Sequence, residues 1–186
     1  ESITARPYTH RPAPESSQKR PLSQGANPYS DITCLEAINL IGTNIVQAVN
    51  DPSEENYDAL MFSGMLAGIG FGNAGCHLPH GMSYAVAGLV KEYQPDGWPA
   101  DHAMVPHGIS VIVNSPAVFR KTGPACPERH WKAAGAMGAD LTDKNMEDGG
   151  KILADQIISM MRETGIPNGL SGVGYTMSDL DALTDR

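Results

Sequence analysis

The sequence is poor in the residue types that mark disulfide-rich or strongly charged proteins. Only 6% of its residues are aromatic and 18% are charged, and its three cysteines, Cys34, Cys76 and Cys126, show no Cys-x-x-Cys spacing. An odd number of widely spaced cysteines argues against a disulfide framework and against a zinc site built from cysteine pairs. We therefore expect reduced thiols, in the cytoplasm or in an organelle such as the mitochondrial matrix.

Long apolar runs and an excess of positive charge are also lacking. We expect no membrane-spanning segment, and no signal-peptide pattern opens the chain. The formal net charge of -8 argues against an electrostatic nucleic-acid binder. With 186 residues, 41% of them hydrophobic, the chain can form one soluble domain with a core of its own. Its first residue is Glu1 and its last predicted helix stops abruptly, so we expect a chain cut from a longer parent at both ends.

Two regions differ in character. Residues 1–29 carry five prolines among Ser, Gln and Asn, which predicts an irregular, extended segment. Residues 30–186 show helical spacing of apolar residues and no convincing strand, so we predict an all-α helical domain. The predicted helices run from a Ser30 cap to Asp51-Pro52, from a Ser53 cap past Gly68, from about Gly81, over 108–122 with a bend at Pro116, from Pro127, from Asp143 to Gly165, and from Ser178.

Two groups of glycines in this region predict different structural features. Gly64 and Gly68 leave one helix face bare, so another backbone can approach it closely. The run from Gly70 to Gly75 matches the pattern G-x-G-x-x-G, but a dinucleotide loop needs a strand before it and a helix after it. Because a helix is predicted to precede the run, we expect it to serve close packing or close approach to a ligand.

A Pro-His-Gly step occurs twice, at His80 and at His107, each time at the predicted start of a helix. Two interpretations stay open from the residues alone: two packed structural histidines, or two imidazole ligands of one metal ion. Two histidines are fewer than the three or four protein ligands that a metal site needs. His77 lies three residues before His80, although Pro79 makes one continuous helix doubtful. His10 and His130 are expected to be solvated or packing residues.

The stretches "GIGFGNAGCHLPHGMSYAVAGLV" and "DHAMVPHGISVIVNSPAVF" resemble the iron-containing, or group III, alcohol dehydrogenase family, and most closely its hydroxyacid–oxoacid transhydrogenases. The resemblance implies a two-domain enzyme of the dehydroquinate synthase-like fold, with an N-terminal NAD-binding domain and a helical metal-binding C-terminal domain. This chain corresponds to the second of these. Family metal sites use one Asp and three His, and the first two ligands come from a helix reading D-x-x-x-H-A-x-E-S. Glu1-Ser2 matches the end of that pattern.

The resemblance also implies roles for residues of this chain that match functional positions of the family. His80 and His107 match the third and fourth metal ligands, and the glycine after each would let the helix start approach the metal. Tyr84 stands where many relatives have a second histidine near the nicotinamide, and is the candidate catalytic residue. Phe71 matches an aromatic residue that lines the nicotinamide and substrate cleft.

The implied reaction is hydride transfer between an alcohol or a hydroxy acid and NAD. The implied metal is Fe(II), with Zn(II) as the alternative, acting as a Lewis acid on the substrate oxygen. The substrate is a small molecule, the protein is expected to be a homo-oligomer, and the chain alone is expected to be inactive. The sequence leaves open a non-catalytic helical binding module and a helical metal phosphohydrolase, for which Asp101-His102 has the wrong order.

Overall fold

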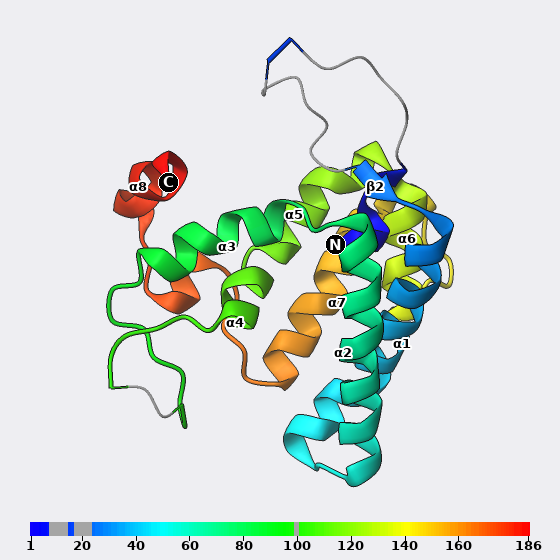
Figure 1. The fold of residues 1–186 in the computed structure, drawn as a ribbon, viewed down its shortest axis with the longest axis horizontal. Helices are drawn as coiled ribbons and strands as arrows, with labels where there is room; N and C mark the ends of the chain where they lie inside the picture. Colours follow the sequence, from blue (N-terminus) through cyan, green and yellow to red (C-terminus); the bar gives the residue numbers. More distant parts are fainter. Residues whose placement is uncertain (8–14, 17–23, 99–100) are drawn as a thin grey trace.

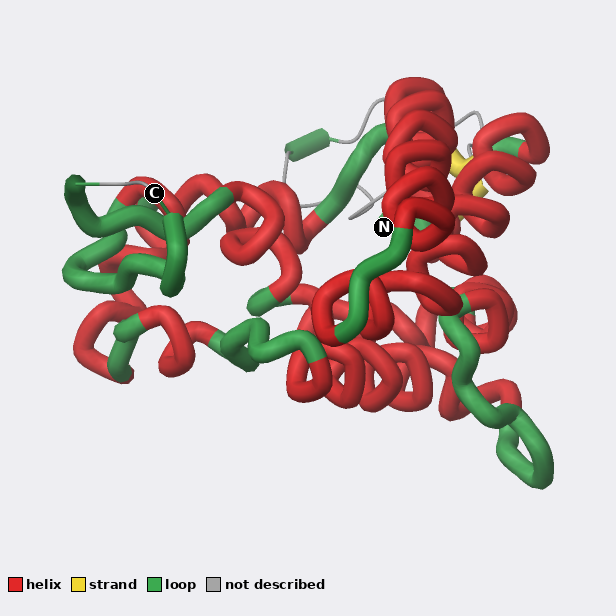
Figure 2. Tube along the Cα trace, turned by 90° about the horizontal axis from the view of Figure 1, so that it is seen from below, coloured by secondary structure: helices red, strands yellow, loops and turns green. Residues whose placement is uncertain are grey.

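The computed structural model describes residues 1–7, 15–16, 24–98 and 101–186. Within these residues the chain is mostly helical, with one short pair of strands, which confirms the predicted all-α fold (Figures 1 and 2). The strands β1 (Arg6–Pro7) and β2 (Gln24–Ala26) pair in parallel. The expected solvated histidine His10 lies outside the described residues.

Two long helices, α1 (Pro28–Asn50) and α2 (Glu54–Ala74), run side by side as an antiparallel pair (Figure 1). The predicted Ser53 cap is confirmed, since its side chain accepts a hydrogen bond from the backbone N–H of Asn56 at 3.2 Å. Helix α1 begins earlier than predicted. The Asn27 side chain caps it by accepting from the N–H of Ser30 at 3.0 Å, and proline occupies the first turn, where no N–H is needed.

The remaining helices are shorter than these two. The α-helices are α3 (Leu78–Gly88), α4 (His107–Ile112), α5 (Ser115–Thr122), α6 (Pro127–Ala136), α7 (Gly149–Glu163) and α8 (Leu180–Asp185). Short 3₁₀ turns are η1 (Ser2–Thr4), η3 (Gly123–Ala125), η4 (Met146–Asp148), η5 (Leu170–Val173) and η6 (Met177–Asp179).

The core lies along α7. Leu153, Ile157 and Met161 recur on one face of this helix and are almost fully buried. They belong to one cluster with Phe119 of α5 and Ala133 of α6. The predicted helix between Asp143 and Gly165 is therefore present, although its first turn is 3₁₀ and its regular part starts only at Gly149.

For residues 1–7, the structure corrects the prediction of an irregular, extended segment. The first five residues are packed rather than extended, and Ile3 and Ala5 are 2% and 1% exposed. The turn η1 and the strand β1 lie within this segment. Burial of this start depends on partners more than 70 residues away in sequence, which local patterns do not reveal.

Two proline positions also differ from expectation. Helix α3 starts at Leu78 rather than near Gly81, because Pro79 sits in its first turn, where proline is tolerated. The segment 107–122 is helical, as predicted, but the break falls at Val113–Asn114. Pro116 starts the second of the two helices instead of bending one.

Helix α1 is long and apolar enough, by length and composition, to cross a membrane, which corrects the expectation that no segment reaches that length. The core helix of a soluble protein passes the same test. Helix α1 packs along α2 and contributes Cys34 and Ala37 to the buried residues. We therefore describe it as part of the helical bundle.

The bare face predicted at Gly64 and Gly68 is present, but no described atom approaches it. A Cβ at either position would meet nothing within 4 Å. Close backbone approach occurs elsewhere, where Gly150 of α7 crosses Gly123. A Cβ on Gly150 would lie 2.7 Å from the Gly123 Cα and closer still to the Phe119 carbonyl oxygen.

We expect Gly150→Ala to lower the free energy of unfolding by roughly 1–3 kcal/mol, because the added methyl group overlaps backbone atoms that cannot move independently. Gly64→Ala is the matched control. It fills open space on an exposed helix and should raise the free energy of unfolding by up to about 1 kcal/mol. Urea unfolding followed by far-ultraviolet circular dichroism measures both. Equal effects of the two substitutions would contradict the close crossing.

Candidate metal centre

His80 and His107 come together at the starts of two packed helices. His80 is the third residue of α3 and His107 is the first residue of α4. Their ring centres are 5.1 Å apart, with the ring planes at 64°. The expected proximity of these two imidazoles is confirmed.

The spacing of the two rings fits a shared ion. Two imidazoles that bind one tetrahedral ion at about 2.1 Å place their ring centres roughly 5 Å apart. The His80 side chain is 32% exposed, so one edge of its ring is open to a ligand. These two side chains can therefore supply two ligands of a divalent metal, and their role as ligands stays a prediction.

Glu1 lies against His80. Its Oε1 is 2.6 Å from Nδ1 of His80, and its Oε2 accepts a hydrogen bond from the backbone N–H of His77 at 2.6 Å. Glu1 matches the glutamate of the family pattern D-x-x-x-H-A-x-E-S, and no role was assigned to it from the sequence. Its place in that pattern, three residues after the family's histidine ligand, was the available signal.

Cys76 also approaches this group. Its sulfur, a carboxylate oxygen of Glu1 and a ring nitrogen of His80 all lie within 4.8 Å of one another. Burial, and then the nearby Glu1 carboxylate, raise the pKa of the Cys76 thiol.

His77 has a packing role. Its Nε2 lies 2.9 Å from the Thr4 hydroxyl, and its ring meets Phe119 edge-on with centres 6.1 Å apart. Burial lowers the pKa of His77 to about 4, so the ring is neutral at physiological pH. Its Nδ1 has no hydrogen-bond partner among the described residues. The structure does not bring this side chain into the His80 and His107 pair.

The two other assigned residues flank His80. Phe71, on α2, is 49% exposed and lines an apolar cavity of about 420 Å³ whose wall also includes Glu1, Cys76 and His80. Tyr84 follows His80 by one helical turn on α3 and is 68% exposed. Its catalytic role stays a prediction, and it is not among the residues that line the cavity.

Two remaining histidines lie away from this site. His130 is fully buried rather than at the surface, with Nε2 2.9 Å from the Thr122 hydroxyl and Nδ1 3.0 Å from the carbonyl oxygen of Cys126. His102 is exposed and pairs with its neighbour Asp101 at 2.8 Å. Neither contributes to the pair formed by His80 and His107.

The glycine-rich run lies inside a helix. Helix α2 continues through Gly70 and Gly72 to Ala74, and Gly75 ends it with a φ of 79°. A helix precedes the run, as predicted, so it lacks the strand that a dinucleotide loop needs. Gly70 instead packs against Cys34 of α1.

Several known proteins are similar to this chain over nearly all of its length. The mitochondrial hydroxyacid-oxoacid transhydrogenase of Xenopus laevis is 45% identical over 185 residues, which cover 98% of this chain and 40% of that protein. The Homo sapiens protein of the same name is 42% identical with the same coverage. The chain therefore spans about two fifths of the length of these relatives.

Solved structures show the same fold. A 1,3-propanediol oxidoreductase superposes with a TM-score of 0.75 at 28% identity, over 88% of this chain and 40% of that one. An alcohol dehydrogenase from Oenococcus oeni gives 0.76 at 24% identity with the same coverage. Residues 22–186 match the family described as "Fe-containing alcohol dehydrogenase family, C-terminal". The chain belongs to this family and has the helical fold of its C-terminal domain.

Proposed function

We propose that this chain forms the metal-binding helical part of an oxidoreductase that transfers hydride between an alcohol or hydroxy acid and NAD. The observation that carries the proposal is the pair of imidazoles, His80 and His107, at a spacing suited to one metal ion. Its position in a chain that belongs to the Fe-containing alcohol dehydrogenase family supports a catalytic rather than a structural ion.

His80 and His107 would hold the ion, with the remaining ligands supplied by other groups. The family name favours iron, and imidazole also suits zinc. When bound, the ion supplies a Lewis acid that polarises the oxygen of an alcohol or carbonyl group. The chain's own contribution is to hold the two imidazoles at the starts of two packed helices.

Phe71 and the apolar cavity would exclude water from the reacting carbon. The Tyr84 hydroxyl, one turn beyond His80, is the proposed group that holds or passes a proton at Oη at the mouth of the site. NAD binding is proposed to depend on groups outside this chain, since the glycine-rich run is helical and no strand precedes it.

The transhydrogenase names of the relatives favour a reaction in which NAD is reduced by a hydroxy acid and reoxidised by an oxo acid. Their mitochondrial names favour the mitochondrial matrix as the location. The substrate would be a small molecule, and a homo-oligomer is part of the same proposal. A helical binding module without catalysis is the competing function, and the presence or absence of hydride transfer separates the two.

We expect His80→Ala and His107→Ala each to weaken Zn(II) binding at least about tenfold, because each removes one of two imidazoles that face one another. His102→Ala is the control, since this exposed histidine lies in a separate loop. Isothermal titration calorimetry at a pH above 7 measures all three. A chain whose Zn(II) affinity depends on only one of the two histidines would contradict a shared centre.

Hydride transfer is best tested in a chimera, because the chain spans about two fifths of its relatives. Replacing the matched segment of the Xenopus laevis protein by this chain should preserve transfer from a hydroxy acid to an oxo acid. His107→Ala in the chimera should remove it. A folded chimera that binds metal but transfers no hydride would favour the non-catalytic binding module.

Calorimetric titration of the chain alone with NAD tests the assignment of the glycine run. We expect no binding in the micromolar range, because that run lacks the strand and turn that place backbone N–H groups around a pyrophosphate. Micromolar affinity of the isolated chain would contradict the proposed division of the cofactor site.

A further inference from the structure

The Glu1 side chain contacts two different groups at the start of helix α3. One of its carboxylate oxygens faces Nδ1 of His80 at 2.6 Å, and the other accepts the backbone N–H of His77 at 2.6 Å. The Glu1 side chain is only 9% exposed, so water competes weakly for its oxygens. The carboxylate is therefore held in one orientation by two different donors.

The 2.6 Å contact bears on which ring nitrogen of His80 carries hydrogen. A carboxylate without a proton only accepts hydrogen bonds, so Nδ1 of His80 would be the donor to it. In a neutral imidazole the other nitrogen, Nε2, then has a free lone pair. Nδ1 is turned to Glu1, and the ring as a whole faces His107 with centres 5.1 Å apart.

We propose that Glu1 is a positioning residue that holds His80 in the Nδ1–H form, so that Nε2 is the nitrogen offered to the metal. The inference rests on the proposed metal centre and adds a residue to which no role was assigned. Metal-bound histidines commonly donate their second ring N–H to a carboxylate, which fixes the ring and raises the basicity of the ligand.

A competing arrangement would use Glu1, Cys76 and His80 as direct ligands, since their donor atoms lie within 4.8 Å of one another. Two atoms that share an ion at 2.0–2.2 Å are separated by roughly 3 Å or more in tetrahedral or octahedral geometry. The 2.6 Å between Oε1 and Nδ1 is shorter than that and is a hydrogen-bond distance. The geometry therefore favours Glu1 as the partner of the ligand rather than as a ligand.

The first measurement needs no metal. Long-range ¹H–¹⁵N correlation spectra of the chain, recorded at about pH 8 and thus above the ordinary histidine pKa of about 6.5, report which ring nitrogen carries hydrogen. We expect Nδ1–H for His80 in the native chain and a shift towards Nε2–H, the form favoured in water, in Glu1→Ala. Glu1→Gln keeps an acceptor oxygen and should retain part of the Nδ1–H form.

Thr4→Val is the matched control. It removes the contacts of the Thr4 hydroxyl with His77 and with the main-chain carbonyl oxygen of Glu1, and leaves the Glu1 carboxylate and the His80 ring chemically unchanged. The His80 tautomer should be unchanged in this variant. A native His80 in the Nε2–H form, or equal shifts in Glu1→Ala and Thr4→Val, would overturn the inference.

The second measurement uses Co(II) as the probe. Glu1→Ala should weaken Co(II) binding about 10–100-fold, with Glu1→Gln between it and the native chain, whereas Thr4→Val and Cys76→Ser should change it little. A sulfur-to-cobalt charge-transfer band that disappears in Cys76→Ser would show direct ligation by the thiolate and would overturn the inference.

The two measurements separate this inference from the proposed centre. If Co(II) binds with no dependence on His107, the shared centre fails and Glu1 has no role toward it, even where the spectra show Nδ1–H on His80. If both histidines are needed but Glu1→Ala binds Co(II) as tightly as the native chain, the centre stands and the role of Glu1 fails.

Discussion

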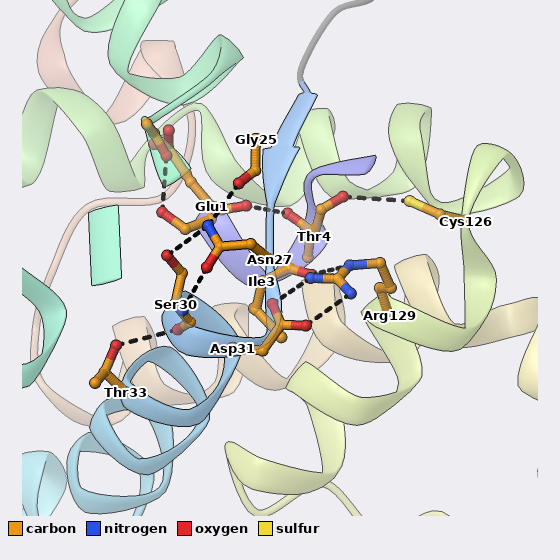
Figure 3. A network of polar contacts seen from close by, with 12 residues as sticks. Glu1, Ile3, Thr4, Gly25, Asn27, Ser30, Asp31, Thr33, Cys126 and Arg129 are labelled. Carbon is orange, nitrogen blue, oxygen red and sulfur yellow. Dashed lines mark hydrogen bonds and ion pairs between the residues drawn. The ribbon is translucent and has the colours of Figure 1, made fainter. Parts of the chain in front are cut away.

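The arrangement of the site depends on the hydrogen bonds that the guanidinium group of Arg129 makes with two other segments. It donates from Nε to the carbonyl oxygen of Ile3 at 2.7 Å, and its two terminal nitrogens bind the two carboxylate oxygens of Asp31 (Figure 3). The side chains of Arg129 and Asp31 are 10% and 26% exposed, so the pair is only partly shielded from water. Removing one partner of a fully buried pair costs about 3–5 kcal/mol, and the partial exposure of Asp31 reduces that cost here. One side chain of α6 therefore fastens both the start of α1 and the turn η1.

Because Arg129 holds the turn η1 in place, it also positions the contacts that η1 makes with the rest of the chain. Ser2 donates to the carbonyl oxygen of Gly75 at 2.8 Å, and the Thr4 hydroxyl meets His77. Both contacts are made with the segment between α2 and α3, which lies just before His80 in the chain. Cys126, one turn before His130, adds a contact from its sulfur to the carbonyl oxygen of Thr4. The candidate metal centre is thus built where a short N-terminal segment meets a helix start more than 70 residues later.

Local signals in the sequence predicted the helices well and this junction poorly. The Ser53 cap and the start at Pro127 were correct, because capping depends on residues within one turn. The repeated Pro-His-Gly step and the family resemblance together indicated that His80 and His107 meet. The burial of Ile3 and the role of Arg129 were missed, because these partners lie 126 residues apart and leave no periodic pattern. A separation of 79 residues likewise concealed the contact between Glu1 and His80.

The N-terminus of helix α3 lacks a side-chain cap of its own, and the Glu1 carboxylate supplies the missing acceptor. Its N-cap residue, His77, provides no side-chain cap, and Pro79 has no N–H to satisfy. The Glu1 carboxylate takes the His77 N–H and places negative charge at the positive end of the helix, which stabilises that end. The same carboxylate orients the imidazole of His80 three residues on. Because one group completes the helix start and contacts the His80 ring, the direction of His80 is coupled to the packing of the first five residues. That packing depends in turn on Arg129.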